Sequence, residues 1–92
     1  MSILHTASNE AALQRCLRFI AAGDALLLIE DGVYLSRRPS DNSALSGVTL
    51  LALKDDLDAR GLTLGPKGSV SAATMAGYVQ LCCDYDKLIN WF

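Results

Sequence analysis

Residues 25–34 read ALLLIEDGVY, an apolar run that ends abruptly in two acidic residues and a glycine. The first five residues carry no polar side chain toward either face, which is typical of a strand in a parallel sheet covered by helices on both sides. Ligands of such sheets collect outside the carboxyl ends of the strands, so Glu30 and Asp31 are candidate site residues. Gly32 permits a backbone turn that other residues resist.

The segments around this strand alternate between strand-like and helix-like patterns. Strands are predicted over 2–6, 48–53 and, weakly, 70–73; helices over 8–24, 54–61 and 74–92; one helical turn over 33–38; and loops over 40–47 and 65–69. Such alternation with short joints indicates an α/β fold with right-handed crossovers. We expect a single domain, residues 1–92, with three layers and a mostly parallel central sheet of about four strands.

The composition limits the classes of function. The chain has 92 residues, of which 51 % are hydrophobic and 20 % are charged, so we expect a partner chain to cover some apolar surface. Its net charge is −2 and its eight Lys and Arg residues are scattered, which argues against direct nucleic-acid binding. The absence of a leader-like or membrane-length apolar segment predicts a cytoplasmic protein with free thiols.

His5 is the only histidine, and it lies near the end of the first predicted strand. It either pairs with Glu30 or Asp31 as a base-orienting dyad or satisfies a local carbonyl. A stand-alone enzyme would depend on that dyad. No phosphate-binding glycine loop accompanies it, and the cysteines lack zinc spacing, so neither a cofactor nor a metal is expected.

Cys16 lies on the apolar stripe of the first predicted helix, between Arg15 and Arg18. It is either a small buried hydrophobic residue or a thiol whose pKa the neighbouring cations lower. Cys82 continues the apolar stripe of the last predicted helix and is expected in the core. Trp91 and Phe92 either fold back on the core or form a subunit contact.

Five short motifs occur in matching order along the chain: SILHT (2–6), EDGVY (30–34), DLDARGL (56–62), AGYVQL (76–81) and WF (91–92). Together they resemble the DsrH/TusB family of sulfur-relay subunits over essentially the whole chain. The resemblance implies a DsrEFH-like domain of flavodoxin-like topology.

The resemblance also implies a partnership and a function. Members are accessory subunits of a heterohexamer with two related sister subunits, and the complex passes persulfide sulfur to a small acceptor protein. In the TusB branch the sulfur reaches the wobble uridine of tRNA, whereas the DsrH branch serves oxidative sulfur metabolism. Cys16 matches a position where the DsrH branch keeps a cysteine, which makes it a candidate accessory persulfide site. A purely structural oligomerisation module is the other alternative.

Overall fold

The computed structural model describes residues 2–37, 45–64 and 70–92. Its elements, in chain order, are β1 (Ile3–Ala7), α1 (Glu10–Cys16), β2 (Ala25–Leu28), the 3-10 helix η1 (Glu30–Arg37), β3 (Thr49–Leu53), α2 (Lys54–Ala59), β4 (Val70–Ala73), α3 (Met75–Asp84) and β5 (Lys87–Trp91). The loop predicted over 65–69 and most of the one predicted over 40–47 lie outside the described residues.

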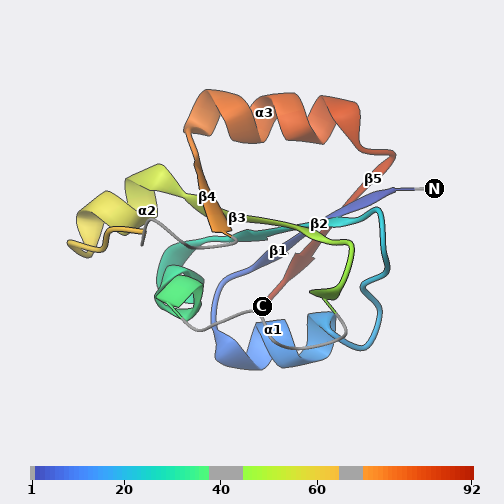
Figure 1. Ribbon diagram of the computed structural model, residues 1–92, viewed down its shortest axis with the longest axis horizontal. Coiled ribbons are helices and arrows are strands. Elements are labelled where there is room, and N and C mark those ends of the chain that lie inside the picture. The colour runs from blue at the N-terminus through green and yellow to red at the C-terminus, as the bar shows by residue number, and fades with distance from the viewer. Residues whose placement is uncertain (1, 38–44, 65–69) are drawn as a thin grey trace.

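The five strands form one sheet in the order β4-β3-β2-β1-β5, and every neighbouring pair is parallel. From β1 to β4 the chain moves steadily toward one edge, and α3 then carries it back across the sheet to β5 on the opposite edge. Since such crossovers are right-handed, this reversal places α3 on the face opposite α1 (Figure 1). The predicted three-layer α/β architecture is confirmed.

The fully buried strand β2 divides the core into two clusters, because its successive side chains point to opposite faces. Leu26 and Leu28 join the cluster beneath α1, η1 and α2, whereas Ala25 and Leu27 join the cluster beneath α3. Each fully buried leucine contributes roughly 1.5–3 kcal/mol to folding. The continuous apolar run of the sequence therefore reflects burial on both faces of the sheet.

Local signals begin α1 and α3 and end α2 as expected, whereas α1 ends at Cys16, well before the end of the helix predicted over 8–24. The Asn9 side chain accepts from the Ala12 backbone N–H at 2.8 Å and caps α1, and Thr74 caps α3 through the Gly77 N–H at 3.0 Å. Gly61, which follows the cap of α2, has a φ of 64° that favours glycine. Among the described residues, no helix has the length and apolar character needed to cross a membrane.

The prediction of one long helix over 74–92 is wrong. Helix α3 ends at Asp84, and Lys87–Trp91 forms a fifth strand, one more than expected. Strand β5 pairs with β1 along its whole length, and the Asp86 carboxylate accepts from the Ser2 backbone N–H at 3.0 Å. Residues 87–91 therefore form a strand because they pair with the edge of β1, although the spacing of their apolar residues also suits a helix.

Gly32 of η1 lies directly against the backbone at the end of β1. A β-carbon at this position would lie 2.2 Å from the backbone oxygen of Ala7, and its backbone N–H donates to the Ile29 carbonyl at 2.8 Å. Only glycine lets the start of η1 cross the end of β1 at this distance. The glycine of the EDG motif is therefore required by packing.

We expect Gly32→Ala to lower the free energy of unfolding by about 1–3 kcal/mol, because the added methyl group overlaps the Ala7 carbonyl. Urea denaturation measures this change. Gly77→Ala is the matched control: the added methyl group meets only the Thr74 hydroxyl, at 3.3 Å, and alanine favours the helix. Equal stability of the two variants would contradict the packing argument.

Candidate functional site

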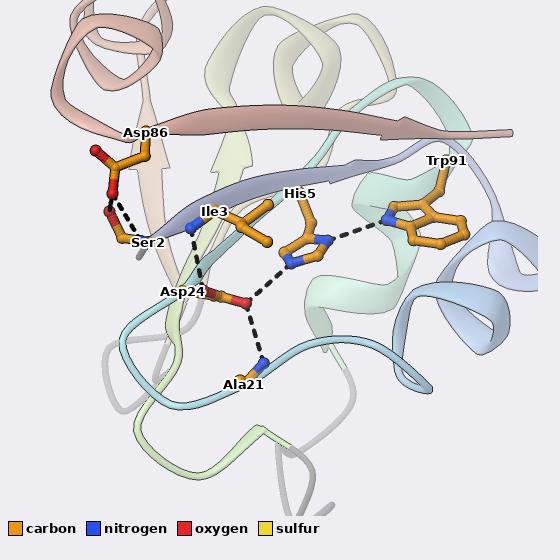
Figure 2. A network of polar contacts seen from close by, with 7 residues as sticks. All are labelled: Ser2, Ile3, His5, Ala21, Asp24, Asp86 and Trp91. Atoms are coloured by element: carbon orange, nitrogen blue, oxygen red, sulfur yellow. Dashed lines mark hydrogen bonds and ion pairs between the residues drawn. The ribbon is translucent and has the colours of Figure 1, made fainter.

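A buried polar network links the beginning of the chain to its last strand (Figure 2). Its centre is Asp24, which directly precedes β2 and is 3 % exposed. The carboxylate accepts hydrogen bonds from the backbone N–H of Ile3, the backbone N–H of Ala21 and Nε2 of His5, each at 3.0 Å. His5 in turn contacts Trp91 of β5. We call His5, Asp24 and Trp91 the buried triad.

The contacts of His5 determine its tautomer. The indole Nε1–H of Trp91, which can only donate, lies 3.0 Å from Nδ1 of His5, so Nδ1 must be the acceptor. The proton of the neutral ring therefore resides on Nε2, which donates to Asp24. With no exposed surface on His5, both ring nitrogens depend on these two partners.

The surroundings of Asp24 keep it ionised despite its burial. Burial alone raises the pKa of this carboxyl, but the hydrogen bonds from His5, Ala21 and Ile3 outweigh it and hold the pKa below its ordinary value. The carboxylate is consequently a fixed negative charge inside the protein. Its role in this geometry is to orient the His5 ring and to join three segments of the chain.

The structure does not bring His5 together with Glu30 or Asp31. The Glu30 backbone N–H donates to the Asp56 carboxylate at 2.7 Å, and Asp31 pairs with Arg60 at 3.0 Å. These contacts join η1 to α2 at the carboxyl end of the sheet. The predicted dyad of His5 with Glu30 or Asp31 is therefore wrong, and His5 instead pairs with the buried carboxylate of Asp24.

The backbone at Glu30 is strained, since its φ of 50° is uncommon for a residue other than glycine. The hydrogen bond from its N–H to Asp56 and the packing of Gly32 hold it there. Asp31 is 74 % exposed in its ion pair with Arg60, so that pair contributes little to stability. Glu30 and Asp31 thus present charge to the solvent, whereas Gly32 is buried.

Cys16 is fully buried at the end of α1, among the apolar side chains of the sheet. Burial, reinforced by the negative charge of Asp24, raises the pKa of its thiol to about 12. The flanking arginines are not what determines its state, contrary to one of the two interpretations of the sequence. In this conformation Cys16 is a protonated, inaccessible thiol.

Cys82 and Cys83 are exposed free thiols on α3, which contradicts the expectation that Cys82 belongs to the core. None of the residues of α3 is fully buried, because no other described helix packs beside it on its face of the sheet (Figure 1). Within the described parts of the chain, no group of three His, Cys, Asp or Glu side chains could hold a metal ion.

Trp91 also supports a surface feature. Phe19 stacks on the indole with ring centroids 5.5 Å apart, and Phe92 follows in the chain. Phe19 is 65 % exposed and Phe92 75 %, large values for phenylalanine. We call the stacked pair Phe19 and Trp91, together with the exposed Phe92 that follows Trp91 in the chain, the aromatic patch; Trp91 links it to the buried triad.

Asp24 is the residue that sequence reasoning missed. Its only local signal is an acid directly before a run of five apolar residues, in the same position that a solvated loop residue would occupy. Partners that donate to it come from residues 3, 5 and 21, and only the tertiary fold brings them together.

The fold is that of a small α/β protein with a parallel sheet, and the polar groups of the buried triad hold its segments together. The sequence model of the family described as DsrH like protein matches residues 5–88. Protein TusB of Salmonella dublin is 34 % identical over 97 % of this chain and 100 % of its own length, and Protein TusB of Pectobacterium parmentieri is 33 % identical over the same shares. This chain belongs to the DsrH family, which confirms the resemblance to sulfur-relay subunits.

A solved structure shares the fold. The crystal structure of the ychN protein from E. coli superimposes with a TM-score of 0.74 at 18 % identity, covering 98 % of this chain and 97 % of that one. At this identity the likeness concerns the fold alone, and it supports the five-stranded arrangement described above.

We expect Cys16 to resist thiol reagents in the folded protein. A pKa of about 12 in place of 9.0 lowers the thiolate fraction at neutral pH on the order of a thousandfold, in addition to steric protection. In a variant carrying Cys82→Ser and Cys83→Ser, Cys16 is the sole thiol of the chain. The absorbance change of a chromogenic disulfide reagent then measures the reaction rate of Cys16 alone.

Denaturant should restore rapid reaction of Cys16 in that variant. The matched control is Cys16→Ser, which retains the two exposed thiols and should react quickly without denaturant. Comparable native rates for the two variants would show that Cys16 is accessible.

We expect Asp24→Asn to destabilise the fold by about 2–3 kcal/mol at neutral pH, since charged hydrogen bonds in the interior are lost. The pKa of Asp24 is lowered in the folded state, so its contribution is complete above the ordinary value of 3.8 and disappears as the pH falls through the folded-state value. Thermal unfolding of both proteins between pH 3 and 7 measures this: the difference should narrow at the acidic end. A constant difference would contradict the assignment.

Proposed function

We propose that this chain is a TusB-like accessory subunit of a sulfur-relay complex that passes persulfide sulfur to an acceptor protein for 2-thiolation of the tRNA wobble uridine. The observation that carries the proposal is the match to TusB proteins at 34 % identity over nearly the whole of both chains. The family match over residues 5–88 supports it.

The state of Cys16 supports a scaffolding role within that complex. Sulfur transfer requires a thiolate that attacks the outer sulfur of a donor persulfide, and hence an approachable thiol. Cys16 is buried and protonated, so an accessory persulfide function would need α1 to move. We therefore propose that a sister subunit carries the reactive sulfur. The burial of Cys16 is also consistent with the second candidate function, a structural module that takes no part in sulfur chemistry.

The partners we propose are two related sister subunits in a heterohexamer, together with a small acceptor protein, in the cytoplasm. The aromatic patch supports a subunit contact, because large exposed aromatic side chains are enriched at protein–protein interfaces. Glu30 and Asp31 form a second candidate contact at the carboxyl edge of the sheet. With a net charge of −2, direct binding of nucleic acid is not part of the proposal.

Reconstitution with the two presumed sister subunits tests this function. The complex would be given a persulfide donor, and intact-protein mass spectrometry would locate the added sulfur. With the exposed Cys82 and Cys83 replaced by serine, we expect a one-sulfur adduct on a sister subunit and none on this chain. Wobble 2-thiouridine in tRNA from cells that lack this chain should fall, and Cys16→Ser should restore it as well as the wild type does.

An adduct on Cys16 that forms only in the complex would make this chain a relay station. Unchanged thiolation without the chain would contradict the proposed pathway. For the interface, Phe19→Ala with Phe92→Ala should weaken assembly by at least about tenfold, measured by light scattering. Asp31→Ala serves as the comparison: if it leaves assembly and sulfur transfer unchanged, the acidic edge is not a contact.

A further inference from the structure

The buried triad leaves only one place for a second proton on His5. Nε2 already carries a proton and donates it to Asp24, so protonation must occur at Nδ1. Nδ1 lies 3.0 Å from the indole Nε1–H of Trp91, which cannot accept a hydrogen bond. Two N–H groups would then point at each other, and the contact between β1 and the Trp91 side chain must break.

We propose that His5 is a proton-operated latch, which holds the Trp91 indole while the imidazole is neutral and releases it when the imidazole is protonated. Histidine is the side chain whose charge ordinarily changes between pH 5 and 8.

The groups around His5 make this release selective. In the sheet its neighbours are Leu26 of β2 and Ile89 of β5, which carry no charge. The ionisable group that contacts the ring is Asp24, and Cys16 of α1, which lies in the field of Asp24, stays protonated. An imidazolium keeps and strengthens its bond to the carboxylate. Protonation thus strengthens the contact of His5 with Asp24 and breaks its contact with Trp91.

The loss of the indole bond does not detach the strand. Trp91 remains paired with Ala7 through the sheet, and its carbonyl accepts from the Ser8 hydroxyl at 3.3 Å. At the neighbouring position the Thr6 hydroxyl donates to Asn90 at 2.7 Å. The indole side chain alone is freed to move.

Movement of the indole changes the aromatic patch, since Phe19 stacks directly on it. If the patch contacts a sister subunit, the latch makes that contact dependent on pH. This consequence depends on the proposed function, whereas the latch itself is a property of the isolated chain and is tested without any partner.

The chain contains one histidine and one tryptophan, so their signals need no assignment by mutagenesis. The experiment titrates the isolated chain from pH 8 to 5 and follows the imidazole and indole N–H resonances by NMR, with tryptophan fluorescence in parallel. We expect the indole resonance to shift and the emission to move to longer wavelength, both with the midpoint of the His5 titration. His5→Gln keeps a donor and an acceptor but does not titrate, so its indole signals should stay constant.

Three results would overturn the latch. The first is protonation of His5 with no change at the indole. The second is that His5 stays neutral until the protein unfolds. The titration of the wild-type chain is sufficient to detect either of these two results. The third is a His5→Gln variant that shows the same pH-dependent change in Trp91. Absence of complex formation with sister subunits would bear on the proposed function and leave these results unaffected.

Discussion

The carboxylate of Asp24 lies where three parts of the chain meet: the beginning of β1, the turn after α1 and the beginning of β2. A carboxylate inside a protein is strongly unfavourable unless donors surround it, and here two backbone N–H groups and the His5 ring do so. The arrangement requires these segments to arrive together. Through His5 it extends to Trp91, so one buried charge joins the first and last strands of the chain.

The same charge shapes the chemistry of its neighbourhood. Cys16 packs near it, and burial together with the negative potential favours the protonated thiol. Cys16, which the family resemblance made a candidate persulfide site, is thus held in an unreactive state by the core that surrounds it. The exposed groups of the protein lie elsewhere, in the aromatic patch, on α3 and at the acidic edge.

The two faces of the sheet are unequally covered, and topology explains why. The chain moves in one direction from β1 to β4 and returns only once, so α1, η1 and α2 share one face while α3 lies alone on the other (Figure 1). Helix α3 buries none of its residues completely and leaves Met75 and Val79 largely exposed. Part of the exposed apolar surface of the protein therefore lies on α3.

The sequence by itself determined the α/β class, the buried central strand and where the α-helices begin, because these depend on periodicity and on caps such as Asn9 and Thr74. It also indicated the family, since the five motifs are local. Tertiary structure alone decided the fate of residues 87–91: an amphipathic spacing suits helix or strand, and the unpaired edge of β1 selects the strand. It alone chose Asp24 as the partner of His5, because strands adjacent in the sheet bring together residues nineteen positions apart.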